Sequence, residues 1–395
     1  MKIDSLTVKE MANNRTTEPH ILPIYATSSF VFDDIEQGIE IFKNIESGHV
    51  YSRYANPTVD AVAEKIAALE THGLGAQATA VMTSSGMSAI STLMLGVLKS
   101  GDKVLTQGNL YGGTTELLKG ILGQFGVETI FADFRELETV ESLLRSDAKI
   151  KMLYCETPAN PTLACVDITA LAKIAHQYGA YCAIDNTFAT PLLQQPFACG
   201  VDFIIHSTTK YLNGHGNSLA GIIIGLDKKA MREGVWRAMK LVGTNCSPFE
   251  AWLTHNGLKT LALRMERHCA NAQQLAEYLE KHPSIEKVNY PGLTSHTDHL
   301  LAKRQMPGGF GGMLSFELKG GLEAGVSCMN RIRFCTLAPT LGDVDTLILH
   351  PASSSHLAVP KEVRLQNGIT DGLIRVSVGI ENPADIIADL EQAIQ

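Results

Sequence analysis

The chain has 395 residues, which is long enough to bury a large core and suggests roughly two or three domains of ~150 residues each. Apolar residues make up 45% of it and charged residues 19%, which excludes wholesale disorder. The net charge of -8 leaves no basic footprint for nucleic acid or an anionic membrane, and no apolar run is long enough to span a bilayer.

Neither the N-terminus nor the cysteines indicate export. Residues 1–15 lack the apolar core of a secretion signal. The eight cysteines are scattered, and none forms a Cys-x-x-Cys pair or a cluster with zinc spacing. We therefore expect a cytoplasmic chain with reduced cysteines and no structural metal.

Residues 1–60 differ from the rest of the chain and are predicted to form an extended N-terminal arm. His20–Phe32 are expected to be extended, because Pro23 discourages a helix around it. An aromatic and arginine segment, Tyr51–Thr58, follows and ends in a turn. This arm has no partner in its own sequence neighbourhood, so we expect it to pack on a distant surface, such as a second subunit.

From residue 59 onward, strands and helices alternate. Apolar residues at helical spacing predict helices over 59–69, 88–98, 111–122 and 169–178. Runs of β-branched and aromatic residues predict strands over 76–83, 103–106, 127–131, 152–155, 181–184, 203–205 and 219–226. This alternation favours a largely parallel sheet with helices on both faces, in a domain from about 61 to 255.

Residues 256–395 are predicted to form a smaller α+β domain. It begins with a long amphipathic helix over 262–280 and ends with a helix over 383–394 that has proline at its start. Strands are expected at 313–317 and 374–378.

Residues suited to binding and catalysis follow the strand predicted at 203–205. A partly desolvated lysine at the end of a buried strand, such as Lys210, has a lowered pKa and can form a Schiff base with a carbonyl. Ser207 and Thr209 are two residues apart, so in extended chain their hydroxyls point the same way. On these residues alone, a surface lysine that ends a strand remains the alternative.

Other strand ends carry further candidates. Ser84–Met87 link a strand to a helix, which favours an anion such as phosphate, although ordinary helices often begin this way. Asp185 closes an apolar strand, where a carboxylate needs a cation or a protonated ring nitrogen unless it is a turn or N-cap residue. Tyr111 either stacks on the ring of a ligand or packs in the core. Asn160 either binds a ligand through its side-chain amide or belongs to an ordinary proline-rich turn. Together they match pyridoxal phosphate: a phosphate cradle, a stacking ring, an acid and a lysine.

The chain resembles the cysteine and methionine metabolism family of pyridoxal-phosphate enzymes. This family contains cystathionine γ-synthase, cystathionine γ- and β-lyases, methionine γ-lyase and O-acetylhomoserine sulfhydrylase. The markers are Tyr51-Ser-Arg-Tyr-Ala-Asn-Pro-Thr, Ser85-Gly-Met, Tyr111-Gly-Gly-Thr, Glu156-Thr-Pro-Ala-Asn-Pro, Asp185-Asn-Thr-Phe, Ser207-Thr-Thr-Lys, His350-Pro-Ala-Ser and Ile374-Arg-Val-Ser-Val-Gly. The resemblance implies an aspartate-aminotransferase-like large domain of fold type I, with a mostly parallel, seven-stranded-type sheet.

The resemblance also implies how the cofactor is held. Lys210 would form the Schiff base with pyridoxal 5'-phosphate, and Asp185 would pair with the ring nitrogen. Tyr111 would stack on the ring. The phosphate would be bound by Gly86, Met87, Ser207 and Thr209.

A small amino-acid substrate and a second subunit complete the implied site. Arg375 would grip the substrate α-carboxylate, helped by Asn160 and the backbone near Thr340. From the residues alone, a strand arginine paired with a surface acid is the alternative for Arg375. Tyr51 and Arg53 would reach the neighbouring subunit's phosphate, which implies a shared-site dimer and, as in the family, a homotetramer of two dimers.

The implied reaction takes place at the γ-carbon of the substrate. Lys210 would take the α-proton while the ring stores the charge, and Tyr111 would be the acid for the leaving sulfur. The lyases of the family release a 2-oxo acid, ammonia and a thiol, whereas the synthases make a replacement product. A dehydrogenase is disfavoured because no Gly-x-Gly-x-x-Gly follows a strand, and the intact set of site residues disfavours a non-catalytic protein on this fold.

Specificity is predicted from two positions after Tyr111. Methionine γ-lyases usually carry cysteine where this chain has Gly113, and many enzymes acting on cystathionine carry arginine where it has Glu116. A glutamate facing the site would repel the distal carboxylate of cystathionine. Residues 265–273 and 340–353 resemble methionine γ-lyases and sulfhydrylases. We therefore expect a sulfur amino acid γ-lyase, with a γ-replacement synthase that uses an O-acylhomoserine as the alternative.

Overall fold

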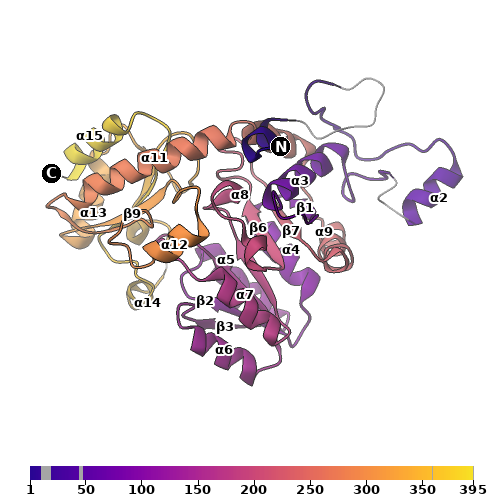
Figure 1. The fold of residues 1–395 in the computed structure, drawn as a ribbon, viewed down its shortest axis with the longest axis horizontal. Helices are drawn as coiled ribbons and strands as arrows, with labels where there is room; N and C mark the ends of the chain where they lie inside the picture. The colour runs from indigo at the N-terminus through magenta and orange to yellow at the C-terminus, as the bar shows by residue number, and fades with distance from the viewer. Residues whose placement is uncertain (10–18, 44–47, 358, 395) are drawn as a thin grey trace.

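The structure is a computed structural model, which describes residues 1–9, 19–43, 48–357 and 359–394. Its two β-sheets are bridged by the long helix α11, Leu261–Glu280 (Figure 1). Leu261 and Met265 at the start of α11 belong to a core beneath the larger sheet, whereas Ala272 and Leu275 belong to the core of the smaller one. Among the residues described, no helix is long and apolar enough to cross a bilayer.

The larger sheet has seven strands in the order β1-β7-β6-β5-β4-β2-β3. Its strands are β1 (Thr79–Thr83), β2 (Lys103–Gln107), β3 (Glu128–Ala132), β4 (Ile150–Glu156), β5 (Tyr181–Asp185), β6 (Phe203–Ser207) and β7 (Gly221–Gly225). The five strands from β6 to β3 pair in parallel, and β7 pairs antiparallel with both β6 and β1. The predicted, mostly parallel sheet is confirmed, with β7 as the strand that reverses direction.

Helices cover both faces of this sheet, because its central strands are apolar on both sides. One face packs against α3 (Pro57–Glu70), α6 (Leu137–Ser146) and α7 (Ile168–Gln177). The other packs against α4 (Gly86–Val97), η2 (Leu117–Leu122), η4 (Ala230–Trp236) and α9 (Arg237–Val242). Ile204 and Ile205, successive and fully buried residues of β6, belong to the two different cores, as the alternation of a strand requires.

Some predicted boundaries differ from the structure. β1 begins at Thr79 rather than at 76, and the helix predicted over 111–122 is divided into α5 (Gly112–Glu116) and the π-helical segment η2. Helix α6 has no counterpart among the predicted elements. Only Val140 and Leu144 of its residues are buried, so its apolar periodicity is short.

The smaller sheet has five strands in the order β10-β11-β12-β9-β8. They are β8 (Ile285–Asn289), β9 (Met313–Leu318), β10 (Thr336–Leu337), β11 (Leu347–Leu349) and β12 (Leu373–Ser377). Helices α11, α13 (Gly321–Arg331) and α15 (Pro383–Ile394) share a core with one of its faces. Ile374 and Val376 of β12 lie in that core, so Arg375 between them points to the opposite face.

Shorter helices complete the connections. They are α8 (Thr190–Leu193), η3 (Pro196–Cys199), α10 (Pro248–Leu258), α12 (His299–Gln305), η5 (Pro351–Ser353) and α14 (Lys361–Gln366). The predicted domain limits at about 60 and 255 stay predictions. They separate the arm, the strands of the larger sheet and the strands of the smaller sheet.

The N-terminal segment has two parts that behave differently. Helix α1 (Ile3–Val8) packs on α3 and α11 of the same chain, whereas α2 (Ile35–Lys43) stands away from the body of the molecule (Figure 1). Val31 is 96% exposed and Phe42 is 64% exposed, which is unusual for large apolar side chains. Ser29, which precedes α2, makes an isolated antiparallel bridge with Tyr51, which follows it.

Candidate active site

A cavity of about 210 Å³ opens where the parallel strands β4, β5 and β6 end. The predicted residues Gly86, Met87, Tyr111, Asn160, Asp185, Ser207, Thr209, Lys210 and Arg375 line it. A larger and more open depression of about 510 Å³ lies beside α11 and α15, where Tyr278, His282 and Glu391 line it with none of the predicted residues. The smaller cavity is the candidate site, because polar groups of complementary chemistry converge there.

Lys210 and Arg375 meet at a single residue of the smaller domain, Thr340. The Lys210 Nζ donates a hydrogen bond of 2.8 Å to the hydroxyl oxygen of Thr340, and the Arg375 Nη2 donates one of 2.8 Å to its carbonyl oxygen. Burial, and to a lesser degree the charge of Arg375, lower the pKa of Lys210 to about 8 against the opposing effect of Asp343. The amine therefore loses its proton far more readily than a free lysine does, as a nucleophile or base requires.

Two buried polar atoms at the cavity have no partner within the described residues. They are the Nε of Arg375, whose residue is 4% exposed, and the Oδ1 of Asn160, whose residue is 9% exposed. Unpartnered groups of this kind are costly unless a ligand completes them. Burial also lowers the pKa of Arg375 to about 10, so an anionic ligand would offset a real electrostatic cost. A carboxylate suits this guanidinium.

The start of α4 forms a cradle against the end of β6. The Ser85 hydroxyl oxygen accepts a 3.0 Å hydrogen bond from the N–H of Ser88 and caps the helix, while the N–H groups of Gly86 and Met87 lie in the first turn, which has no intrahelical acceptor. A Cβ on Gly86 would lie 2.7 Å from the Cβ of Ser207, so only glycine permits this approach. A helix start with free N–H groups beside a serine suits a phosphate.

Thr209 also lines the cavity, but its hydroxyl is already engaged. Its Oγ1 donates to the carbonyl oxygen of Ala220 at 3.2 Å and accepts from the Ala220 N–H at 3.1 Å. β6 ends at Ser207, and Thr209 lies in the turn that follows. The extended geometry from which we predicted parallel hydroxyls at Ser207 and Thr209 is therefore wrong.

Two carboxylates stand side by side on neighbouring strands, Asp185 on β5 and Glu156 on β4. The Asp185 Oδ1 accepts a 3.0 Å hydrogen bond from the N–H of Thr187, and burial raises the pKa of Asp185. Burial and the adjacent Asp185 charge raise the pKa of Glu156 to about 8. A protonated ring nitrogen would stabilise the charged form of Asp185, as predicted for this residue.

Glu156 is a site residue that the sequence analysis missed. Its two carboxylate oxygens accept hydrogen bonds of 2.9 and 3.1 Å from the N–H of Tyr111, so it fixes the start of α5. Glu156 closes an apolar strand as Asp185 does, and the same argument would have found it.

Tyr111 stands at the mouth of the cavity with 52% of its surface exposed. A Cβ on Gly113 would lie 2.7 Å from the Cε1 of this ring, so the neighbouring glycine sets how closely the tyrosine packs on its own helix. Glu116 is exposed and lies outside the cavity lining, so it does not face the site of its own chain.

Tyr51 and Arg53 do not line the cavity of their own chain. The Arg53 Nη1 donates a 2.7 Å hydrogen bond to the carbonyl oxygen of Lys240, and its guanidinium lies 5.5 Å from the Tyr51 ring centre and 5.2 Å from that of Tyr54. Their predicted contact with a neighbouring subunit's phosphate stays a prediction. Taken together, the cavity's lysine, carboxylate, tyrosine and helix-start cradle fit pyridoxal phosphate.

Comparison with known proteins also indicates a pyridoxal-phosphate enzyme, over nearly the whole chain. The family model described as Cys/Met metabolism PLP-dependent enzyme matches residues 4–395. The chain is 48% identical to an L-methionine gamma-lyase of Fusobacterium nucleatum subsp. nucleatum over 95% of this chain and 93% of that protein. It is 41% identical to an O-succinylhomoserine sulfhydrylase of Pseudomonas aeruginosa over 99% of this chain and 94% of that one.

A solved structure is similar throughout. A Campylobacter jejuni protein named for O-acetylhomoserine (thiol)-lyase activity, which carries N'-pyridoxyl-lysine-5'-monophosphate, superposes with a TM-score of 0.92. The two are 33% identical, and the match covers 100% of both chains. These matches confirm the predicted α/β fold and the predicted cofactor.

Proposed function

Because the chain belongs to the Cys/Met metabolism family of PLP-dependent enzymes, we propose that it is a carbon–sulfur lyase of sulfur amino acids. The proposed reaction is the α,γ-elimination of methionine, cystathionine or homocysteine, which yields a 2-oxo acid, ammonia and a thiol. One observation carries the proposal. Thr340 contacts both the Lys210 amine and the Arg375 guanidinium, so a base and a carboxylate-binding group border the same space.

The proposed roles of the cofactor-binding residues follow from their positions. Bound pyridoxal phosphate supplies an electron sink for negative charge that develops on the substrate. Lys210 holds the cofactor covalently between turnovers, and Asp185 bonds to the protonated ring nitrogen. The phosphate-binding residues in this proposal are Gly86, Met87, Ser207 and Thr209.

The remaining residues act on the substrate. Arg375 and Asn160, with their unpartnered buried atoms, bind the α-carboxylate and orient the α-carbon toward Lys210. The freed Lys210 amine takes the α-proton and moves it away from the α-carbon, which makes the β-protons acidic. The amine then takes a β-proton, so the bond between the γ-carbon and sulfur can break with its electron pair leaving on sulfur. Tyr111, at the cavity mouth, donates a proton to the sulfur as it leaves. The 48% identity to an L-methionine gamma-lyase supports a lyase reaction.

A γ-replacement synthase is the second candidate. Two observations favour it: Gly113 stands where methionine γ-lyases usually carry cysteine, and an O-succinylhomoserine sulfhydrylase is 41% identical over 99% of this chain. Both reactions need the same lysine, acid and arginine, so they differ in whether a second nucleophile enters the site.

Product analysis distinguishes the two reactions. The protein is incubated with methionine, cystathionine, homocysteine or cysteine, and separately with O-acetylhomoserine and sulfide. A lyase releases equal amounts of ammonia and 2-oxo acid from one of the sulfur amino acids. Homocysteine formed from O-acetylhomoserine, without ammonia from any sulfur amino acid, would establish the synthase instead.

Lys210→Ala tests the assignment of the lysine. We expect no turnover and no cofactor mass on this chain after borohydride reduction, because the only amine proposed to hold the cofactor is gone. The fold should persist, as far-ultraviolet circular dichroism would show. A cofactor mass found on any other lysine of the unchanged protein would refute the assignment.

We further propose that the active unit is at least a dimer with shared sites, and that two such dimers form a tetramer. The exposed apolar side chains of the arm, such as Val31 and Phe42, support a protein partner for it. In this arrangement Tyr51 and Arg53 complete the phosphate site of the neighbouring subunit.

A further inference from the structure

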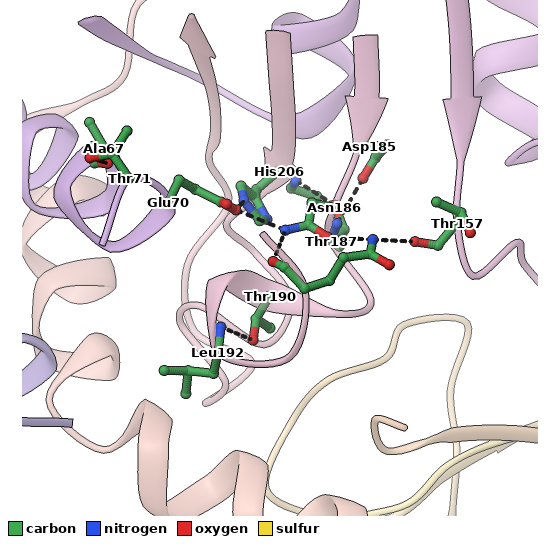
Figure 2. Close-up of polar contacts among 12 residues, drawn as sticks. Ala67, Glu70, Thr71, Thr157, Asp185, Asn186, Thr187, Thr190, Leu192 and His206 are labelled. Atoms are coloured by element: carbon green, nitrogen blue, oxygen red, sulfur yellow. Dashed lines mark hydrogen bonds and ion pairs between the residues drawn. The ribbon is translucent and has the colours of Figure 1, made fainter. Parts of the chain in front are cut away.

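A buried polar network lies behind the ends of β5 and β6 (Figure 2). The His206 Nε2 lies 2.6 Å from the Glu70 Oε1, and neither side chain has any exposed surface. The same oxygen accepts a 2.8 Å hydrogen bond from the side-chain amide of Asn186. Because a carboxylate oxygen only accepts, the His206 Nε2 donates to it. One carboxylate at the end of α3 thus joins two strands of the sheet.

The network continues to a third strand. The Asn186 Nδ2 also donates to the carbonyl oxygen of Gln194 at 3.1 Å, and the Gln194 Nε2 returns a 3.0 Å hydrogen bond to the Asn186 Oδ1. That Nε2 also donates to the carbonyl oxygen of Thr157, just after β4, at 3.1 Å. Figure 2 shows the chain of bonds from Glu70 to Thr157. All of these residues are buried.

His206 in β6 and Asn186, the residue just after β5, are each the immediate neighbour of a cavity residue. His206 precedes Ser207, and Asn186 follows Asp185. Since successive side chains of a strand point to opposite faces, a bond to His206 on one face sets the orientation of Ser207 on the other. A displacement of Glu70 would therefore move Ser207 and Asp185 together.

Stability alone does not account for a charged group here. A buried carboxylate is costly, and apolar residues of similar volume often stabilise a protein as well or better. The Glu70 Oε2 and the His206 Nδ1 have no hydrogen-bond partner within the described part of the chain, so the pair is not fully satisfied. The hydrogen bonds of Glu70 do constrain the orientation of the side chains they join, because a hydrogen bond restricts angles that an apolar contact leaves free.

We propose that Glu70 is a positioning residue, whose hydrogen bonds to His206 and Asn186 hold Ser207 and Asp185 where they meet the phosphate and the ring nitrogen of the cofactor. The inference rests on the proposed roles of Ser207 and Asp185. Glu70 itself does not line the cavity, so it acts only through its two partners.

The test compares Glu70→Leu, which removes both hydrogen bonds, with Glu70→Gln, which keeps an oxygen acceptor at the same place. Apoprotein is titrated with pyridoxal phosphate, and the dissociation constant is read from the visible absorbance of the bound cofactor. For Glu70→Leu we expect the dissociation constant to rise about tenfold and kcat to fall about tenfold, because both hydrogen bonds that orient the neighbours of Ser207 and Asp185 are lost. The KM for the amino acid should change by less than about threefold, because Arg375 lies on the other sheet. Glu70→Gln should restore the cofactor dissociation constant to within about threefold of the unchanged protein.

A matched control separates positioning from general destabilisation. Asn289 of the small sheet is also buried and donates a 3.1 Å hydrogen bond to the hydroxyl of Ser315. Asn289→Ala should lower resistance to urea and leave the cofactor dissociation constant unchanged. An equal loss of cofactor affinity in this variant would overturn the inference, since the effect would then follow stability alone.

Two further results would overturn the positioning role proposed for Glu70. Unchanged cofactor binding in Glu70→Leu overturns the inference, and so does Glu70→Gln if it is as impaired as the leucine variant. Should Glu70→Leu fail to fold, His206→Leu and His206→Gln are compared in the same way, because glutamine keeps a donor near the Nε2 position. Failure of the proposed function would look different: the unchanged protein itself would carry no cofactor on Lys210.

Discussion

Gly113 is the position at which one added methyl group should affect the chemistry most selectively. A Cβ there would lie 2.7 Å from the Cε1 of Tyr111 and 3.2 Å from the Sδ of Met87, so the tyrosine ring must move. Gly113 is also one of the two positions from which the sequence analysis predicted specificity. A side chain at position 113 would therefore change where the ring of Tyr111, the proposed acid, lies.

Gly113→Ala should lower kcat/KM by about tenfold, because the displaced Tyr111 hydroxyl no longer reaches the leaving group, a cost of about 1.4 kcal/mol. Gly112→Ala is the matched control, since a Cβ at Gly112 meets nothing within 4 Å and the two glycines share one helical turn. Steady-state kinetics of both variants on the same substrate provide the measurement. Similar values for the two variants would mean that the Tyr111 ring is not held by Gly113.

At the scale of elements, helix α7 depends on its N-cap residue, Asp167. The Asp167 Oδ1 accepts a 3.0 Å hydrogen bond from the N–H of Ala170, and its Oδ2 lies 2.6 Å from the Nη2 of Arg304 in α12. The Arg304 side chain is 65% exposed, so this ion pair is screened by solvent. The cap should therefore matter more than the ion pair.

Asp167→Ala should destabilise the protein by about 1 kcal/mol, the usual cost of losing an N-cap. Arg304→Ala removes only the ion pair and should cost less than about 0.5 kcal/mol. Urea unfolding followed by circular dichroism measures both. Asp167→Ala removes the cap and the ion pair together, so equal losses in the two variants would show that the cap adds nothing to stability.

Asp389 of helix α15 holds the loop at residues 333–335 of the small domain by hydrogen bonds. The carboxylate of Asp389 accepts hydrogen bonds from three backbone N–H groups, of Arg333 at 2.9 Å, Phe334 at 2.9 Å and Cys335 at 2.8 Å. Burial alone would raise the pKa of Asp389, but these donors lower it below the ordinary value. A carboxyl with a lowered folded-state pKa stabilises the fold above its unfolded pKa, and this stability is lost as the pH falls through the folded value.

Asp389→Asn should therefore cost about 1.5–3 kcal/mol at pH 7, where the carboxylate is charged, because an amide nitrogen would face backbone donors. The difference from the unchanged protein should shrink as the pH is lowered below about 4, where the unfolded carboxyl becomes protonated. Urea midpoints at pH 7, 5 and 3.5 give the dependence. A difference that stays constant over this range would exclude the charge of Asp389 as its source.

At the scale of the whole molecule, the arm decides whether one chain can complete its own site. Arg53 bonds to the carbonyl oxygen of Lys240 and lies outside the cavity of its own chain, while Lys210 lies within it. If sites are shared in a two-fold dimer, Arg53 of one chain serves Lys210 of the other.

Arg53→Ala and Lys210→Ala should each be inactive or strongly impaired, and a mixture unfolded and refolded together should regain activity. In a hybrid dimer one site carries both changes, and the other takes Lys210 from one chain and Arg53 from the other. Random pairing of equal amounts should restore roughly a quarter of the sites, given two-fold association. Activity that stays absent while mass spectrometry detects hybrids would place Arg53 in its own subunit's site.

The sequence by itself determined the strand ends and much of their chemistry. The apolar runs before Asp185 and Lys210 predicted strands β5 and β6, because a buried parallel strand has apolar residues on both faces. Parallel strands present their carboxyl ends at one edge, which brought these two residues to one predicted site. Such inferences succeed because they depend on residues a few positions apart.

Only the tertiary structure decided which distant side chains meet. Lys210 and Thr340 are 130 residues apart, and Glu70 and His206 are 136 apart, so no local period of 2 or 3.6 residues reports either contact. The direction of β7 and the turn at Thr209 were likewise not determined by apolar patterns, since those patterns indicate burial but not strand direction. The contact between Glu70 and His206 and the contact between Lys210 and Thr340 both depend on packing between segments that are far apart in the chain. A local sequence pattern carries no information about such packing.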